Sequence, residues 1–318
     1  MKVLVTGGAG FIGSNLCEKL LKGGKQVIVL DDFNDFYNPE IKKRNLKNCL
    51  KNKSFTLIEG DIRDKELLKK IFSENKIEKV IHLAARAGVR PSLLNSELYF
   101  DVNVKGTKNL LEESCKKINQ FIFASSSSVY GLNKKIPFSE EDKVVSQVSP
   151  YAKTKLEGEK LCREFSEKYS LPVTCLRFFT VYGPRNRPDM AVFKFTESII
   201  KEKKITLFAE GKMKRDFTFV EDIVDGIIKA MENVFDFEII NLGNNTPHEV
   251  KELIKLIEKN TGKEASIKNE KAPDGDVPIT FADIKKAKKL LDWKPETSLQ
   301  KGIKKFVEWF KNNSINSV

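Results

Sequence analysis

Between Gln120 and Lys155 the chain carries side chains that could move a proton. Tyr151 and Lys155 are four residues apart in a helical pattern, so they lie on the same helix face. An ammonium group near a phenol favours the ionised phenol, and we expect it to lower the pKa of Tyr151. Most Tyr-x-x-x-Lys pairs are ordinary surface residues. Here the four serines Ser125–Ser128 follow a short apolar run, and the three residue types together indicate an acid/base unit for a substrate alcohol.

The elements around this unit predict an α/β fold. Short apolar runs predict strands at Lys2–Thr6, Gln26–Leu30, Phe55–Ile58, Val80–Leu83, Phe121–Ala124 and Val173–Phe178. Helical patterns alternate with them, ending at Leu21 and lying near Lys65–Ser73, Glu97–Lys116 and Tyr151–Lys168. This alternation predicts a Rossmann-type, doubly wound parallel sheet with helices on both faces.

The regular alternation of strands and helices ends after Tyr182, which predicts a second, smaller α/β domain. Its expected elements are a strand at 205–208 and helices near Phe193–Lys203, Asp222–Glu232, Val250–Asn260, Ile284–Leu290 and Leu299–Lys311. We therefore divide the chain into a nucleotide-binding domain, residues 1–180, and a C-terminal domain, residues 181–318. A strand at Glu238–Leu242 is expected to return to the first sheet.

A glycine pattern between the first strand and the first helix predicts a dinucleotide site. Gly7, Gly10 and Gly13 permit a tight turn and let the backbone approach a pyrophosphate at the helix N-terminus. Asp31 ends the next strand, where a carboxylate binds ribose hydroxyls and repels the 2′-phosphate of NADP. We therefore expect NAD as the cofactor, with Asp61 near the adenine edge. His82, at the end of the fourth strand, is expected to be a packed structural residue.

Composition excludes several other classes of protein. The net charge is +12 over 318 residues, but the lysines alternate with glutamates and form no stripe interleaved with aromatics, so we predict no nucleic-acid partner. The positive excess could attract a small anionic substrate. No apolar run approaches the ~20 residues of a membrane span, and five scattered cysteines indicate reduced thiols in a cytoplasm. With only two histidines, no multi-histidine metal centre is expected.

The strings TGGAGFIG, HLAA, SSSSVYG and YAKTK resemble the extended short-chain dehydrogenase/reductase family of nucleotide-sugar enzymes. The longer strings AGVRPSL, RFFTVYGPRNRPDM, FKFT, GKMKRDFTFVEDI and GDVP resemble its UDP-glucuronate 4-epimerases, and the resemblance covers nearly the whole chain. It implies bound NAD, inversion of C4 of UDP-glucuronate to give UDP-galacturonate through a 4-keto intermediate, and a homodimer through the helices at 97–116 and 151–168.

The resemblance also assigns roles to residues. Tyr151 would be the base, Lys155 would hold the nicotinamide ribose, and Ser126 would bridge to the 4-hydroxyl. The cofactor would contact Gly7, Gly10, Phe11, Ile12, Gly13, Asp31, Asp61, Ile62, Leu83, Ala84, Ala85, Asn103, Tyr151, Lys155 and Phe178. The C-terminal domain would bind the nucleotide sugar, and the substrate contacts would be Arg90, Ser127, Ser128, Thr180, Arg187, Arg215 and Asp276. Among these, Arg187 is the candidate for the sugar carboxylate and Arg215 for the diphosphate, whose oxygens a guanidinium fork suits.

Some positions depart from the family or separate its members. Arg86 and Pro91 replace the usual Gln and Tyr, and Pro273 stands where related neutral-sugar epimerases carry Arg. Related decarboxylases and dehydratases carry a carboxylate just before Val-Tyr-Gly, where this chain has Ser128, which favours epimerisation. A UDP-glucose/UDP-galactose 4-epimerase would share the same acid/base and cofactor residues. A UDP-glucuronate decarboxylase and a non-catalytic nucleotide sensor on the same fold are weaker alternatives.

Overall fold

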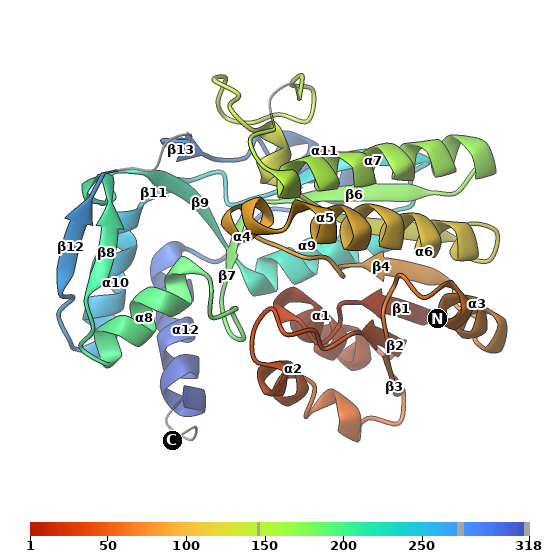
Figure 1. The fold of residues 1–318 in the computed structure, drawn as a ribbon, viewed down its shortest axis with the longest axis horizontal. Coiled ribbons are helices and arrows are strands. Elements are labelled where there is room, and N and C mark those ends of the chain that lie inside the picture. The colour runs from red at the N-terminus through yellow and green to blue at the C-terminus, as the bar shows by residue number, and fades with distance from the viewer. Residues whose placement is uncertain (145–146, 272–276, 315–318) are drawn as a thin grey trace.

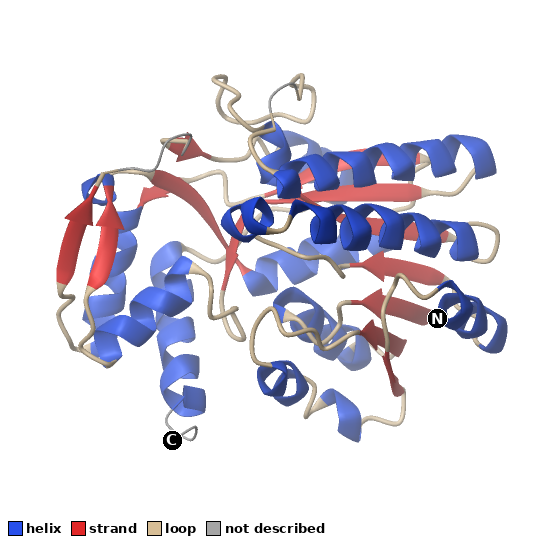
Figure 2. Cartoon of the chain, viewed as in Figure 1, coloured by secondary structure: helices blue, strands red, loops and turns tan. Residues whose placement is uncertain are grey.

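The computed structural model describes residues 1–144, 147–271 and 277–314. Its centre is a seven-stranded parallel sheet in the order β10-β6-β5-β4-β1-β2-β3 (Figures 1 and 2). The strands are β1 (Lys2–Thr6), β2 (Gln26–Asp31), β3 (Phe55–Glu59), β4 (Lys79–His82), β5 (Gln120–Ser126), β6 (Val173–Phe178) and β10 (Phe237–Leu242). The strand order reverses between β1 and β4, which is the place where doubly wound sheets bind ligands. The predicted Rossmann-type sheet is confirmed.

Both faces of this sheet are apolar because its central strands are buried on both sides, whereas the edge strand β3 is only partly buried. Val3 and Val5 pack into one hydrophobic cluster, and Leu4 between them packs into the other, as the two-residue period of a strand requires. The first cluster is covered by α1 (Phe11–Lys22), α9 (Val220–Glu232) and α11 (Lys285–Leu291). The second is covered by α3 (Lys65–Glu74), α6 (Thr107–Ser114) and α7 (Pro150–Tyr169), and α6 and α7 lie side by side in Figure 1.

The C-terminal part builds a third hydrophobic cluster beside the large sheet. It contains α8 (Ala191–Ile200), α10 (Val250–Thr261) and α12 (Leu299–Ser314). One small sheet joins β9 (Lys214–Phe219) to β7 (Thr180–Tyr182), β11 (Pro247–Glu249) and β13 (Ile279–Thr280). Another pairs β8 (Ile205–Phe208) with β12 (Ile267–Glu270). After β9 and α9 the chain returns to the large sheet, where β10 pairs with β6.

The predicted helix over Glu97–Lys116 is wrong as a single α-helix. The segment contains α5 (Ser96–Phe100), a π-helical turn η2 (Asp101–Gly106) and α6. Asn103 lies inside the π turn and is buried, and its carbonyl accepts a hydrogen bond from the Thr107 hydroxyl at 2.6 Å. Periodicity averaged over the whole segment predicts a helix but does not locate a single π turn within it.

The sequence did not predict several other elements. These are α2 (Pro39–Asn45), α4 (Val89–Leu94) and the short strands of the C-terminal part other than β8. Within the described residues, no helix combines the length and the apolar character needed to cross a lipid bilayer.

Candidate active site

Two adjoining cavities lie at the carboxyl ends of the central strands. Both are lined by Phe11, Ser125, Tyr151, Phe178 and Arg187. The first cavity extends over the glycine turn and the end of β2, and the second extends towards the C-terminal part of the chain. Tyr151 therefore stands where the two cavities meet.

The floor of the first cavity is the glycine turn between β1 and α1. Gly7 has φ +70, and a Cβ atom there would lie 2.7 Å from the Ala84 nitrogen. A Cβ on Gly13 would lie 2.3 Å from the Gly7 carbonyl oxygen. Glycine is therefore required at both positions, by backbone conformation at the first and by close approach at the second. The turn brings backbone, rather than side chains, to the cavity wall.

Asp31 lies at the far end of the first cavity and is held by backbone groups. Its carboxylate accepts hydrogen bonds from the nitrogens of Ala9 at 2.9 Å and Phe33 at 3.0 Å. Burial raises the pKa of Asp31, while the nearby Lys42 ammonium and these two hydrogen bonds act in the opposite direction. The carboxylate is thus fixed in place at the position where a ribose hydroxyl is expected.

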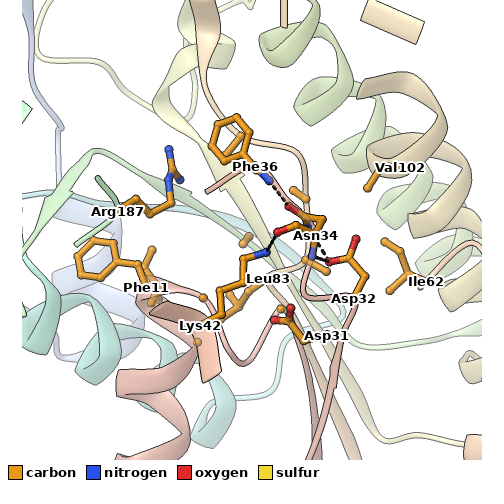
Figure 3. A pocket seen from close by; sticks show the side chains of 18 of the residues that line it. Phe11, Asp31, Asp32, Asn34, Phe36, Lys42, Ile62, Leu83, Val102 and Arg187 are labelled. Atoms are coloured by element: carbon orange, nitrogen blue, oxygen red, sulfur yellow. Dashed lines mark hydrogen bonds between the residues drawn. The ribbon is translucent and has the colours of Figure 1, made fainter. Parts of the chain in front are cut away.

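The loop after β2 forms a wall that the sequence did not reveal. Asn34, Phe36, Tyr37 and Lys42 line the first cavity, and Lys42 donates a hydrogen bond to the Asn34 carbonyl at 2.9 Å (Figure 3). Asn38 caps α2 by accepting from the Glu40 nitrogen, which brings Lys42 back over the cavity. An Asn-Pro pair after the second strand is a helix-start signal that could have located α2.

Most residues predicted to contact the cofactor line this first cavity. They are Gly7, Gly10, Phe11, Ile12, Gly13, Asp31, Asp61, Ile62, Leu83, Ala84, Ala85, Tyr151, Lys155 and Phe178. Asp61 also accepts hydrogen bonds from Arg63 at 2.6–3.1 Å, so its contact with adenine stays a prediction. Asn103 is absent from the lining; its side chain bonds the Arg86 backbone and Thr154 behind the wall, and its contact with the cofactor also stays a prediction.

The acid/base candidates come from β5 and α7. α7 is capped by Ser149, whose hydroxyl accepts from the Ala152 nitrogen at 3.1 Å, and Tyr151 and Lys155 follow on its first turns. The Ser126 hydroxyl lies near the Tyr151 phenol, and both side chains line the second cavity. Lys155 donates to the Ala124 carbonyl at 2.7 Å, and its Nζ lies 6.0 Å from the Tyr151 ring centre.

The lowered pKa expected for Tyr151 is wrong in this structure. Burial raises the pKa of Tyr151, and the Ser126 hydroxyl and the charge of Arg187 offset part of that rise. The Lys155 ammonium is directed at the Ala124 carbonyl instead of the phenol. Burial also lowers the pKa of Lys155 to about 8. Burial thus shifts both groups towards their neutral forms, although Lys155 still carries its charge below pH 8.

The second cavity collects most of the predicted substrate contacts. Ser126, Ser127, Ser128, Thr180, Arg187 and Arg215 line it, together with Val277 and Thr280. Ser128 Oγ is buried and has no hydrogen-bond partner in the described part of the chain. Arg187 binds Asp189 through Nε and Nη2, both at 2.8 Å, so the loop ion pair exists while Nη1 is left for another group.

Two predicted substrate contacts are not among the lining residues. Arg90 lies on α4, with its guanidinium 5.1 Å from the centre of the Phe208 ring. Asp276 lies outside the described residues, as does Pro273, although the neighbouring Val277 lines the cavity. Their roles stay predictions.

Comparison with known proteins decides the family. Residues 4–306 match the family model described as GDP-mannose 4,6 dehydratase. The chain belongs to the extended short-chain dehydrogenase/reductase family. Within this family it is 43% identical to UDP-glucuronate 4-epimerase 4 of Arabidopsis thaliana, over 97% of this chain and 75% of that protein. It is also 43% identical to the UDP-glucuronate 4-epimerase of Thermodesulfobacterium geofontis, over 98% of this chain and 96% of that protein.

A solved structure of the family has the same fold. The UDP-glucuronic acid 4-epimerase of Bacillus cereus, in complex with UDP-glucuronic acid and NAD, superposes with a TM-score of 0.92 at 38% identity. The match covers 98% of this chain and 99% of that one.

Arg86 is a departure from the family pattern that the structure places beside the first cavity. Its Nη1 lies 3.8 Å from the exposed Asp35 carboxylate in the loop after β2, and its Nε is buried without a hydrogen-bond partner in the described residues. Pro91 lies on the short helix α4, next to Gly88, whose φ is +101. Neither residue enters the lining of the two cavities.

Proposed function

We propose that this protein is an NAD-dependent UDP-glucuronate 4-epimerase that forms UDP-galacturonate. The observation that carries the proposal is the place of Tyr151, which lies beside Ser126 where a cavity lined by the glycine turn and Asp31 meets a second, serine-lined one. A tyrosine there can take the proton of a sugar hydroxyl while C4 faces the cofactor. The same hydroxyl returns the proton after the sugar ring has turned.

NAD fits the residues of the first cavity. Glycine backbone at the start of α1 suits the pyrophosphate, and the fixed Asp31 carboxylate suits two ribose hydroxyls but not a 2′-phosphate. Bound NAD accepts a hydride from C4 and returns it to the opposite face of the 4-keto sugar. Lys155 would hold the nicotinamide ribose from its place on α7.

The second cavity suits an anionic nucleotide sugar. Arg215 and Thr180 would meet the UDP portion, and Arg187 with Ser127 and Ser128 would hold the C6 carboxylate. The unpartnered Ser128 Oγ supports this, because a buried hydroxyl without a partner is costly until a ligand supplies one. A neutral serine at this position also avoids the repulsion that a glutamate would exert on the substrate carboxylate.

The proposal also covers the roles of the two domains, the oligomeric state and the cellular location. Residues 1–180 would bind NAD and residues 181–318 the nucleotide sugar, with Tyr151 at the boundary. We expect a homodimer through the helices at 97–116 and 151–168. A cytoplasmic location fits the five cysteines, which are all free and buried.

The closest alternative is 4-epimerisation of UDP-glucose, which needs the same Tyr151, Lys155 and cofactor. The experiment is to incubate the protein separately with UDP-glucuronate and UDP-glucose and to identify the products by NMR. We expect UDP-galacturonate from the first and far slower conversion of the second. Faster conversion of UDP-glucose would replace the proposal by the alternative. Tyr151→Phe serves as the control and should lose ~10² to 10⁴-fold in rate.

A further inference from the structure

His82 is a buried side chain that the proposed chemistry does not use, although it lies under the active site. It ends β4, is 1% exposed, and packs against the rings of Phe121 and Phe123 at 5.9 and 5.8 Å. Both ring nitrogens have hydroxyl partners: Nδ1 lies 2.6 Å from Thr6 Oγ1 and Nε2 lies 2.9 Å from Thr107 Oγ1. Both polar atoms of the buried ring are thus satisfied, and their partners come from two different elements, β1 and α6.

The neighbouring bonds determine which nitrogen carries the proton. Thr107 Oγ1 donates its one hydrogen to the Asn103 carbonyl at 2.6 Å, and a carbonyl can only accept. Thr107 Oγ1 must therefore accept from His82, so Nε2 is protonated. In the neutral ring Nδ1 is then an acceptor, and Thr6 Oγ1 donates to it. Thr6 Oγ1 in turn accepts from the Ala84 nitrogen at 3.3 Å.

The result is a chain of hydrogen bonds in which each group donates to the next. It runs from the Ala84 N–H through Thr6, His82 and Thr107 to the Asn103 carbonyl. The neutral state of His82 is consistent with its surroundings, because burial, together with the nearby charge of Lys155, lowers its pKa to about 3.

One end of this chain lies in the cavity wall, and the other is hydrogen-bonded to α7, which carries Tyr151. Ala84 lines the first cavity and touches the Gly7 turn. At the other end, Asn103 holds the Arg86 nitrogen at 2.7 Å and donates to Thr154 Oγ1 at 3.0 Å. Thr154 donates to the Tyr151 carbonyl at 2.8 Å, in the first turn of α7. The network thus connects β1, β4, the π turn and α7.

We propose that His82, as its neutral Nε2–H tautomer, is a positioning residue. It fixes the position of Ala84, in the wall of the first cavity (the cofactor wall), relative to Tyr151. Since Ala84 belongs to the cofactor wall and Tyr151 is the proposed base, this inference rests on the proposed function. The π turn contributes by placing the Asn103 carbonyl where the Thr107 hydroxyl reaches it, as π turns at functional sites do.

The tautomer can be measured directly. His82 and His248 are the only histidines, so a His248→Gln variant leaves a single ring in a ¹⁵N NMR spectrum. We expect a protonated Nε2 and an unprotonated Nδ1 that do not change between pH 6 and 9. A protonated Nδ1, or titration within this range, would overturn the proposed chain.

The positioning role is tested with Thr107, which permits a near-isosteric change. Thr107→Val removes the hydroxyl that links His82 to Asn103, and Thr107→Ser retains it. Because small displacements of reacting groups are costly, we expect Thr107→Val to lower kcat about 10-fold or more with little change in KM, and Thr107→Ser to stay near the wild type. His82→Phe should act like Thr107→Val, and the double variant should lose little more, since the chain is already broken.

Two further outcomes complete the test. A merely structural role would lower the unfolding temperature of Thr107→Val but leave kcat of the folded protein unchanged, and that result would reject the positioning role. If the wild type shows no epimerase activity, the proposed function fails, and the dissociation rate of NAD replaces kcat as the readout. Faster NAD release from Thr107→Val than from Thr107→Ser would then support the positioning of the cofactor wall, and equal release from both would reject it.

Discussion

At the scale of single residues, proton transfer at Tyr151 depends on its buried neighbours. Burial raises the pKa of the phenol, while the Ser126 hydroxyl and the Arg187 charge lower it. Lys155 has a pKa of about 8, because burial disfavours its ammonium. Near neutral pH a positive Lys155 therefore coexists with a protonated Tyr151. As the pH rises, Lys155 loses its proton, and the positive charge at the proposed nicotinamide-ribose contact disappears with it.

This predicts a specific pH dependence. Below pH 8 Lys155 is charged, and above it the group is neutral, so kcat/KM should fall as the pH rises through about 8. Lys155→Arg should be slower at neutral pH but should lack this fall, because a guanidinium stays charged throughout. Lys153→Arg, on the exposed side of the same helix, is the control and should keep the wild-type profile. An unchanged fall in Lys155→Arg would assign the titration to another group.

Ser128 permits a second prediction at this scale. Oxidising C4 of UDP-glucuronate makes a β-keto acid, which loses CO₂ readily when its carboxylate stands perpendicular to the carbonyl plane. A glutamate at 128 would crowd the turning ring and repel the carboxylate. Ser128→Glu should therefore lose epimerisation and increase UDP-4-keto-pentose or UDP-xylose in mass spectra of the products. Ser128→Gln has nearly the same size without the charge, and should slow epimerisation without the increase. Equal product mixtures from both variants would show that size, rather than charge, matters.

At the scale of elements, α7 holds the base in place through its buried face. Glu159, two turns after Tyr151, binds Arg177 of β6 through two bonds of 2.8 and 2.7 Å and accepts from Ser125 of β5 at 2.5 Å. Glu159 and Arg177 have side chains only 4% and 3% exposed. One buried pair thus attaches α7 to both strands beneath it.

Breaking this pair should destabilise the protein far more than breaking an exposed one. Glu159→Gln leaves the Arg177 cation buried without a counter-charge, and we expect a loss of about 3 kcal/mol in the free energy of unfolding, at the low end of such losses. Glu157→Gln, on the same helix, breaks an exposed pair with Lys160 and should cost less than ~1 kcal/mol. Urea denaturation at pH 7 measures both. Similar losses in the two variants would contradict the anchoring role of Glu159.

The same scale shows what the sequence could predict. The strand at Val173–Phe178 was predicted to the residue, because a short segment rich in apolar and β-branched residues follows directly after Pro172. The glycine turn, Asp31, Tyr151 and Lys155 were found by spacing, which follows directly from strand and helix geometry. Spacing did not find the cavity wall formed by Asn34, Phe36, Tyr37 and Lys42, because this wall depends on how an irregular loop folds back. Likewise the His82 chain joins residues up to 101 positions apart, from Thr6 to Thr107, and no local pattern reveals it.

At the scale of the whole molecule, one helical layer presents apolar side chains to solvent. Phe100 on α5 is 38% exposed, and Leu94 at the end of α4 is 90% exposed. α5, α6 and α7 lie together on the near side in Figure 1, and α7 packs against α4, α5 and α6. Exposed apolar groups on neighbouring helices are typical of a surface that another subunit covers. This agrees with a homodimer through the segments 97–116 and 151–168.

Phe100→Glu tests this assembly. A charge buried between two subunits without a partner is costly, and a twofold interface contains the substitution twice, so the dimer should dissociate at micromolar concentration. Val234→Glu is the matched control, since Val234 is 52% exposed and lies between α9 and β10, away from these helices. Light scattering after size exclusion should give a monomer for Phe100→Glu and a dimer for the wild type and Val234→Glu. Circular dichroism should show that all three are folded. A dimer that survives in Phe100→Glu, or a wild type that is already monomeric, would remove α5 from the interface, and the exposed Phe100 would then be an ordinary surface residue.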